Sequence, residues 1–391
     1  MIKKKNDFLK SLDQIKIILG NGFDLHCKLK TSYNDFFNYK KILIQNIINW
    51  TENVPSNYLK DYLIENPNNL EISLQIPKEM YNSSIWYIFF TLCKNDSQEN
   101  NWSDIEKEMQ DSFSLNIYNS GKTFWENVFV LISQNIDEII KARKNIDIFA
   151  VFMINKYPEI CKIIHLKQKK ELFYQLLLKE LESFEKDFAH YIENIIKIST
   201  IYYNNVNITL NALSSNKLKI ISIESFNFTN LDSYLYNNYF DQKSHIFYNI
   251  NGTTDNPIFG IDSEKIKTID AAYIFTKTSR RLIQNMIKND INEVESFKNI
   301  IIYGHSLDKQ DFNYFFPIFD YLKLDDASSN THIIFAYSDY ESKSKEEIER
   351  IQMKNISYIL EEYEEYIYPK RKQKRLLDSL STEGRIILLK I

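Results

Sequence analysis

The hydrophobic residues of the chain follow two kinds of pattern. Short runs rich in β-branched and aromatic residues, each bounded by a polar or glycine-containing turn, are typical of buried strands. A weak run of this kind lies at 245–248, and the clear ones lie at 15–19, 218–223, 299–303 and 331–337. The pattern therefore predicts one strand near the start of the chain and several more in its second half.

Longer stretches of charged and apolar residues with helical spacing fill the region from about 31 to 200, with 169–197 as an example. The spacing of Ser32 and Asp35 is close to that of a capping box, so we predict that a helix begins there. Stretches that contain Asn and Pro, such as 53–77, interrupt this region and are expected to be loops.

A strand and turn, a long helical segment and then alternating strands and helices indicate an α/β fold. We predict a Rossmann-like, mainly parallel sheet that binds a nucleotide. The predicted nucleotide-binding core comprises residues 1–30 together with 215–391. Residues 31–214 are predicted to form a helical insertion subdomain, placed directly after the first strand and its turn.

The low number of glycines indicates where the functional site lies. Only 7 of the 391 residues are Gly, against an average usage of about 7%. When glycine is this scarce, each remaining one is expected where a side chain would not fit. Five of the seven lie in three neighbourhoods, formed by Gly20 and Gly22, by Gly252 and Gly260, and by Gly304. These neighbourhoods are the candidate site.

Charge and cysteine content exclude several classes of protein. The formal net charge of -4 provides no general attraction to nucleic acid or to anionic membranes, so neither is an expected partner. Three scattered cysteines do not form a disulfide framework. No apolar run approaches the ~20 residues of a membrane span, and the basic first residues, which no apolar run follows, are not expected to be a signal peptide. We expect a cytoplasmic protein, and self-association stays open.

The first candidate turn, Gly20-Asn21-Gly22-Phe23-Asp24, follows the first predicted strand. A tight glycine turn in this position exposes backbone N–H groups, which bind phosphate well. The third glycine of the GxGxxG pattern is absent, and a purely structural turn is the alternative. The carboxylate of Asp24 is suited to binding ribose hydroxyls, to orienting a water or to capping a helix.

Polar residues also follow the later strands. Asn227 and Thr229 come after the second clear strand, and an amide side chain is suited to holding a sugar hydroxyl or a water. The pair Asn251-Gly252 follows the weak strand. Both asparagines have a turn-forming role as the alternative.

The most polar turn is the one at Gly304-His305-Ser306, followed by Asp308 and Asp311. His305 is suited to acid or base chemistry near neutral pH. Both aspartates also have a possible structural role. Asp308 would cap a following helix, and Asp311 would interact with the dipole of that helix. In an α/β fold all these turns meet at the carboxyl edge of the sheet, where ligands bind.

Taken together, these motifs resemble the AbiH family of bacteriophage abortive infection proteins. The resemblance covers the chain from its first strand to beyond residue 310 and rests on the motifs at 17–25, 33–36, 102–106, 226–229, 252 with 259–262, and 304–307 with Asp311. It implies a role in abortive infection, in which an infected cell is stopped before the phage multiplies.

AbiH proteins are in turn similar to sirtuin-like NAD-binding domains. That similarity implies that Gly20 and Gly22 hold a pyrophosphate, that Asn227 acts at the nicotinamide ribose, and that Gly304 and Ser306 contact the nucleoside. Where those domains have a His-Gly pair that supplies the base, this chain has Asn251-Gly252, and an amide cannot act as a general base.

The resulting expectation is an effector that binds NAD or a related nucleotide and hydrolyses it on infection, without a metal. Asp24 and His305 are the available substitutes for the missing base, beside Asn227 as the third catalytic group. Contacts to the ligand are expected from Gly20, Asn21, Gly22, Phe23, Thr229, Asn251, Gly252, Gly304, Ser306 and Asp311.

Two other functions fit the same sequence. The first is a non-catalytic sensor, in which a nucleotide stabilises one conformation and the helical insertion contacts a phage or host protein. The second is a metal-dependent nuclease, with Asp24, Asp308 and Asp311 holding Mg²⁺. The basic run 370–375 would then bind the phosphate backbone.

Overall fold

A computed structural model describes twelve stretches of the chain: residues 12–54, 75–97, 105–114, 122–133, 144–167, 169–214, 220–238, 246–263, 266–283, 296–339, 343–369 and 375–391. The basic run at 370–375 lies outside them except for Arg375, and so do the first three residues of the motif at 102–106. Within these stretches, no helix is both long enough and apolar enough to cross a membrane.

The chain divides into two compact units, each made of separate segments. The sheet unit comprises Met1–Thr31, Ala189–Pro257 and Asn285–Ile391, and the helical unit comprises Ser32–Phe188 and Ile258–Gln284. The predicted boundaries at residues 30 and 214 stay a prediction. In the observed grouping, 189–214 belongs with the sheet and 258–284 belongs with the helices.

The sheet unit contains one six-stranded sheet whose strands are all parallel. The strands are β1 (Ile15–Leu19), β2 (Ile220–Ser225), β3 (Ile246–Asn249), β4 (Asn299–Tyr303), β5 (His332–Tyr337) and β6 (Ile386–Lys390). Their spatial order is β3-β2-β1-β4-β5-β6, which is the order of a Rossmann-like dinucleotide-binding sheet. This confirms the predicted fold class and the predicted strands, whereas β6 was missed.

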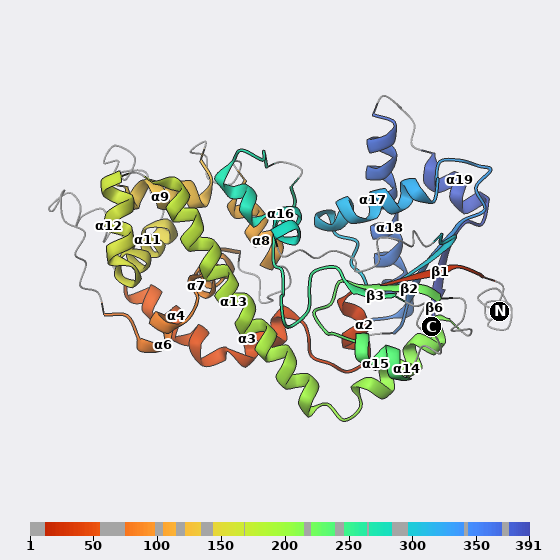
Figure 1. Cartoon of the computed structure of the whole chain (residues 1–391), viewed down its shortest axis with the longest axis horizontal. Helices are drawn as coiled ribbons and strands as arrows, with labels where there is room; N and C mark the ends of the chain where they lie inside the picture. The colour runs from red at the N-terminus through yellow and green to blue at the C-terminus, as the bar shows by residue number, and fades with distance from the viewer. Residues whose placement is uncertain are drawn as a thin grey trace. The chain divides into compact units, whose positions relative to one another are not determined.

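Helices cover both faces of this sheet, as expected for parallel strands. Figure 1 shows α17 and α18 on one side of the strands, and α14 and α15 on the other. The sheet-unit helices are α2 (Asn21–His26), α14 (Tyr202–Leu213), α15 (Asp232–Asn238), α17 (Phe312–Tyr321), α18 (Lys345–Ile367) and α19 (Leu376–Thr382), with a short 3₁₀ turn η3 (Lys309–Asp311).

Alternation along β1 explains why the two faces have separate cores. Ile17 and Leu19 point into one buried cluster with α14, and Ile18 points into the other with α17 and α18. All five residues of β1 are buried, since this strand is central in the sheet. The turn that follows β1 therefore lies at the middle of the carboxyl edge of the sheet, between the ends of β2 and β4.

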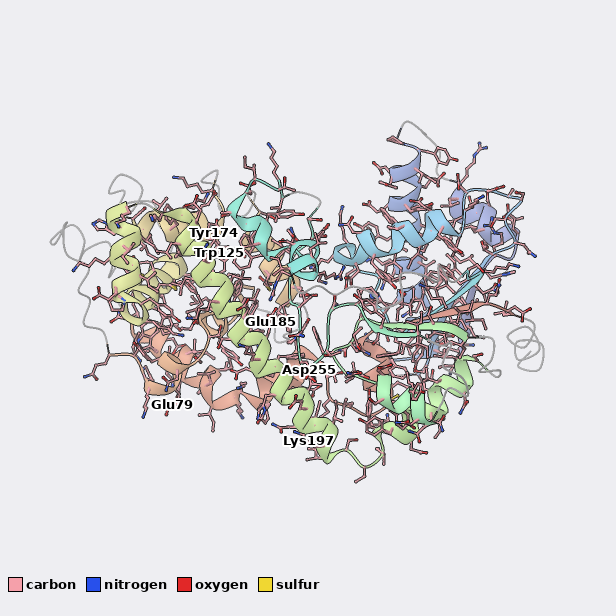
Figure 2. All side chains as sticks on the ribbon, viewed as in Figure 1. Glu79, Trp125, Tyr174, Glu185, Lys197 and Asp255 are labelled. Carbon is pink, nitrogen blue, oxygen red and sulfur yellow. The ribbon has the colours of Figure 1, made fainter. Side chains whose placement is uncertain are left out.

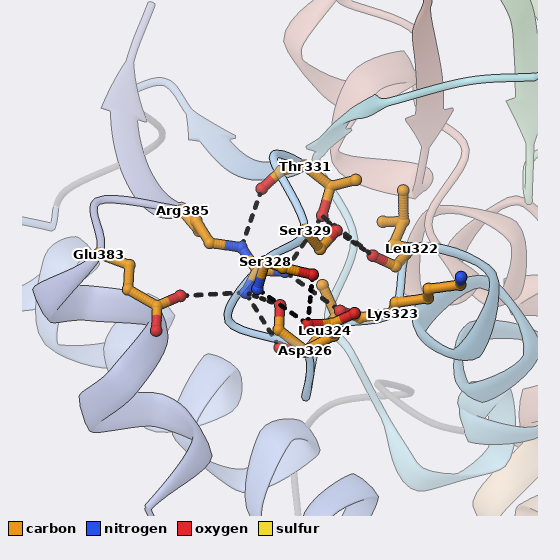
Figure 3. A network of polar contacts seen from close by, with 9 residues as sticks. All are labelled: Leu322, Lys323, Leu324, Asp326, Ser328, Ser329, Thr331, Glu383 and Arg385. Carbon is orange, nitrogen blue, oxygen red and sulfur yellow. Dashed lines mark hydrogen bonds and ion pairs between the residues drawn. The ribbon is translucent and has the colours of Figure 1, made fainter.

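Arg385, directly before β6, ties the loop between α17 and β5 to the last strand (Figure 3). Its guanidinium group donates to the backbone oxygens of Lys323, Leu324, Asp326 and Thr331 at 3.0–3.3 Å. It also forms an ion pair with Glu383 at 3.0 Å and is only 5% exposed. The planar fork of an arginine is suited to so many acceptors at once.

The helical unit begins at α3 (Tyr33–Tyr39). Ser32 caps this helix, since its hydroxyl accepts a hydrogen bond from the Asp35 N–H group at 3.1 Å, which confirms the predicted helix start. The other elements are α4 (Lys41–Asn53), α6 (Lys78–Asn82), α7 (Ile85–Ser97), α8 (Ile105–Ser112), α9 (Phe124–Ile132), α11 (Lys144–Lys156), α12 (Pro158–Lys167), α13 (Lys170–Ile198) as far as Phe188, η2 (Ala271–Phe275) and α16 (Lys277–Ile283).

Aromatic side chains fill the interior of the helical unit. Trp86 and Trp125 have ring centroids 5.0 Å apart and are both fully buried. Phe113 joins Trp125 to Tyr174 and to Phe275, the last residue of η2; Figure 2 labels Trp125 and Tyr174. The returning segment 258–284 is therefore part of this core although it is remote in sequence from the first helices.

A buried ion pair fastens that returning segment. Arg280 on α16 binds both carboxylate oxygens of Glu185 on α13, one of them at 2.7 Å. The same two side chains bind the backbone of Phe259, whose N–H group donates to Glu185 and whose carbonyl accepts from Arg280, both at 2.7 Å. Glu185, which Figure 2 labels, and Arg280 are therefore structural groups of the helical unit.

Candidate functional site

Three turns meet at the carboxyl edge of the sheet, after β1, β2 and β4. β1 lies between β2 and β4. Strands β2 and β3 follow on one side of β1, and strands β4, β5 and β6 follow on the other, so the strand order reverses at this point. Backbone hydrogen bonds join the turns: Gly20 N–H donates to the Tyr303 carbonyl at 2.9 Å, and Phe226 N–H donates to the Leu19 carbonyl at 2.8 Å. Such a reversal of strand order is where ligands bind in open α/β sheets.

The glycines of the first and fourth motifs pack against one another. A Cβ atom at Gly20 would lie 2.5 Å from the Gly304 carbonyl oxygen, and one at Gly22 would lie 2.8 Å from the Gly304 Cα. Gly304 has a φ of +69°, and a Cβ there would lie 2.5 Å from the Phe23 nitrogen. Contact between two backbones thus explains all three glycines, and their contact with a phosphate stays a prediction.

Asn227 lies beside these turns, directly after β2, and is 4% exposed. Its amide nitrogen donates to the Gly20 carbonyl at 3.1 Å, which links the second turn to the first. Its amide oxygen is buried and has no hydrogen-bond partner among the residues that the structure describes. An unsatisfied buried acceptor costs about 1–3 kcal/mol, so this atom is expected to be paired by a water or a ligand.

Asp24, on α2, lies in the interior of the sheet unit. Its side chain is fully buried, and its two carboxylate oxygens accept hydrogen bonds from Tyr202 at 2.6 Å and from Thr229 at 3.0 Å. Burial raises the pKa of Asp24 to about 7, although the two hydroxyl groups oppose the shift. Asp24 and Thr229 therefore join α2 to the turn after β2.

Asn249, the last residue of β3, is a site residue that the sequence did not single out. Its amide nitrogen donates to the backbone oxygens of Asn227 at 2.7 Å and of Thr229 at 3.0 Å. Asn251 follows it and donates to the Phe226 carbonyl at 3.4 Å. The two asparagines hold the turn after β2 by its backbone, and only neighbouring strands in the sheet bring them there.

The residue after them, Gly252, has a φ of +80° and its N–H group donates to the Asn249 carbonyl at 3.4 Å. This left-handed conformation is one that glycine adopts at little cost. The Asn251-Gly252 pair is thus a turn at the end of β3, in agreement with the structural alternative for that motif.

His305 is 8% exposed and packs against Phe226, with ring centroids 4.3 Å apart. Its Nδ1 atom accepts a hydrogen bond from the Leu307 N–H group at 2.9 Å, so the neutral ring carries its proton on Nε2. Nε2 lies 3.5 Å from a carboxylate oxygen of Asp311. The contacts with Leu307 and Asp311 fix the orientation of the imidazole ring in the turn after β4.

The remaining predicted contacts lie around the same turns. Asn21 is exposed, and its side-chain oxygen accepts a hydrogen bond from the Thr31 hydroxyl at 2.6 Å. Phe23 is fully buried and packs edge-on against Tyr303. Ser306 is exposed, and its carbonyl accepts from Asn355 at 2.9 Å. The side chain of Phe23 is therefore part of the hydrophobic core, although the sequence predicted it as a ligand contact.

Two of the aspartates expected to hold a metal, Asp24 and Asp311, contact other side chains of the protein. Within the described residues, no group of three His, Cys, Asp or Glu side chains is arranged to hold a metal ion. Both oxygens of Asp24 accept hydrogen bonds from protein hydroxyls, and Asp311 lies near the His305 ring. Binding of Mg²⁺ by Asp24, Asp308 and Asp311 stays a prediction.

Comparison with known proteins identifies the family. Residues 17–337 match the sequence model of the family described as bacteriophage abortive infection AbiH. The match covers well over half of the chain, so the chain belongs to the AbiH family and its role lies in bacteriophage abortive infection. A search among curated proteins found no matching sequence. The similarity to sirtuin-like domains stays a prediction.

Proposed function

We propose that this member of the AbiH family acts in phage defence by binding a nucleotide at the carboxyl ends of β1, β2 and β4. NAD is the expected ligand, and its hydrolysis on infection is the expected reaction. Loss of a central metabolite would stop an infected cell, whereas binding alone would not.

The observation that carries this proposal is the unpaired amide oxygen of Asn227. It is a buried acceptor beside the glycine turns, at the point where the strand order of a Rossmann-like sheet reverses. A ribose hydroxyl group is a donor of suitable size for such an atom. Asn249 and the Gly20 carbonyl fix the turn and the amide, so that the acceptor needs no reorganisation when the sugar binds.

In the proposed reaction the bond between the nicotinamide nitrogen and C1′ of its ribose breaks. The bonding electrons neutralise the pyridinium ring, nicotinamide leaves, and the oxygen of a water forms the new bond to C1′ while its proton passes to solvent. The role of Asn227 is to orient the sugar through its hydroxyl group. It neither accepts nor donates a proton of the reaction.

The test combines binding and turnover for the purified full chain. Nicotinamide release from NAD is followed with and without extract from phage-infected cells, and binding is measured by calorimetry. We expect Asn227→Ala to lose binding by about 10-fold or more, because one buried hydrogen bond to the ligand disappears. The exposed Asn211→Ala on α14 is the matched control and should behave as the unchanged protein.

Binding that is equal in Asn227→Ala and in the unchanged protein would reject this site. Release of nicotinamide that disappears in Asn227→Ala would support hydrolysis. If the protein binds NAD but releases no nicotinamide even with infected-cell extract, hydrolysis is rejected and binding is retained.

A second candidate function, a sensor without turnover, is favoured by the hydrogen bonds of the two expected bases. Asp24 is fully buried and accepts hydrogen bonds from Tyr202 and Thr229, and His305 accepts on Nδ1 from the backbone, so both expected bases are already engaged by the protein. In that case NAD would raise the melting temperature without being consumed.

A further inference from the structure

A hydrogen-bonded trio of side chains lies at the carboxyl edge of β4 and β5, apart from Asn227. Ser338 follows β5, Tyr303 ends β4, and His26 ends α2. The Ser338 hydroxyl lies 2.9 Å from the Tyr303 hydroxyl and 2.9 Å from His26 Nδ1. All three residues belong to the sheet unit. None of them was singled out from the sequence, since 312 positions separate His26 from Ser338.

The strand register explains how these residues meet. Tyr303 is paired with Ala336 across β4 and β5, and Ser338 lies two positions further along the same face. The His26 ring packs edge-on against the Tyr303 ring, with centroids 5.9 Å apart. Backbone pairing thus sets the positions of the two hydroxyl groups, and α2 brings the imidazole to them.

The direction of the hydrogen bonds follows from the need to satisfy every donor. The Tyr303 side chain is buried and Ser338 is its hydrogen-bond partner in the described residues, so the phenol must donate its proton to Ser338. The Ser338 hydroxyl then donates to His26 Nδ1. The opposite direction would leave a buried phenolic proton without an acceptor, at a cost of about 1–3 kcal/mol.

This direction leaves one lone pair of the Ser338 oxygen unused and directs its proton to a basic nitrogen. Burial, helped by the positive charge of Lys28, lowers the pKa of His26, so the imidazole is neutral near pH 7. Ser338 is 8% exposed and His26 is partly exposed, so the pair borders the surface of this edge. A nucleophile in hydrogen-bond contact with a base is the arrangement of covalent catalysis.

We propose that Ser338 and His26 form a nucleophile and general base that attack an electrophilic acyl or phosphoryl group. The Ser338 oxygen forms a bond to the carbon or phosphorus atom, and its proton moves to His26 Nδ1. The leaving group departs with the electrons of its bond and takes the proton from His26. A water then cleaves the ester in the same way and releases Ser338. This activity does not depend on the nucleotide site at Asn227.

A fluorophosphonate probe tests the proposal on the purified full chain. Attack by Ser338 displaces fluoride and leaves a stable phosphonyl ester, which intact-mass spectrometry counts and peptide mapping locates. We expect one adduct, on Ser338, and none in Ser338→Ala. The exposed Ser381→Ala in α19 is the control and should be labelled like the unchanged protein.

The variant His26→Asn separates catalysis from a structural role. The Asn oxygen replaces Nδ1 as the acceptor of the Ser338 hydrogen bond but does not take up a proton. A base raises such rates by about 10²–10⁴-fold, so labelling should be at least about 100-fold slower while the melting temperature stays close to that of the unchanged protein.

The pH profile supplies a second readout. Tyr303 and Ser338 are the neutral groups that contact His26, and Lys28 is the charged group that acts on it. The labelling rate should therefore rise with pH through a midpoint below 6.5, the ordinary value for His. The proposal is overturned if Ser338 of the unchanged protein carries no adduct, or if His26→Asn is labelled at the original rate.

Discussion

The hydroxyl group of Tyr202 lies 2.6 Å from the carboxylate of Asp24, and both side chains are completely buried. This contact joins α14 to α2, which carries the first glycine turn. Thr229 donates to the second carboxylate oxygen and joins the turn after β2 to the same point. A residue that the sequence placed among the catalytic groups thus has a structural explanation.

The first prediction concerns the pH dependence that Asp24 gives to stability. Its pKa is raised from 3.8 to about 7 by burial, so the folded state binds the proton more tightly than the unfolded state does. The contribution of Asp24 to the free energy of unfolding is fully present below pH 4, and it is lost as the pH rises to about 7. The loss amounts to roughly 4 kcal/mol.

Urea unfolding of the full chain at pH 4, 5.5 and 7.5 measures this effect. Other titrating groups cancel when Asp24→Asn is compared with the unchanged protein at each pH. Asparagine keeps both hydroxyl contacts because Tyr202 and Thr229 can each donate or accept. The advantage of the variant should grow with pH, and an advantage that is constant over the range would contradict the raised pKa.

The second prediction separates two costs of replacing a glycine. Gly304 and Gly384 both have a φ of +69°, but only Gly304 is in close contact with another backbone. Gly384→Ala should lower the free energy of unfolding by about 1–2 kcal/mol, the cost of a left-handed alanine. Gly304→Ala should lower it by more than about 3 kcal/mol, because the turns after β1 and β4 must also separate. Equal losses in the two variants would show that the turns are not in contact.

The third prediction concerns Arg385, the residue in Figure 3 that holds the loop before β5. Arg385→Lys keeps the charge but removes most of the donors, leaving several backbone oxygens without partners. We expect the free energy of unfolding to fall by about 2–4 kcal/mol. Circular dichroism during urea unfolding measures the loss, and a change below ~0.5 kcal/mol would mean that water satisfies those oxygens.

The fourth prediction compares a buried and an exposed ion pair. Arg280→Met leaves the Glu185 carboxylate buried without its partner and should cost about 3–5 kcal/mol. Lys197→Met breaks an exposed pair with Glu193 on the same helix as Glu185 and should cost less than about 0.5 kcal/mol. Denaturant midpoints of the two variants measure the difference; similar midpoints would show that the Arg280 pair is solvated.

The sequence predicted the elements whose signals are local. A run such as 299–303 is buried on both faces of the sheet and is therefore apolar throughout. The strand β6 was missed although 386–389 is an apolar run like the others, and its pairing with β5 at the edge of the sheet is what identifies it as a strand. The return of 258–284 to the helical unit depends on contacts with α8 and α13, and no local pattern reveals it.

The same distinction applies to the candidate site. The glycine turns and Asn227 were found because each directly follows a strand. Asn249 and Tyr202 were not found, because their roles come from positions that the fold brings together over 22 and 178 residues. Only the structure assigns Asp24 to the interior and leaves the amide oxygen of Asn227 unpaired.

The central place of β1 has a consequence for how the protein is made. This strand, at residues 15–19, leaves the ribosome well before its neighbours β2 and β4, which begin at residues 220 and 299. At a synthesis rate of about 5–20 residues per second, an apolar strand waits for tens of seconds without a partner. Newly made chains should therefore depend on chaperones during translation, and slower translation would lengthen the period in which they aggregate.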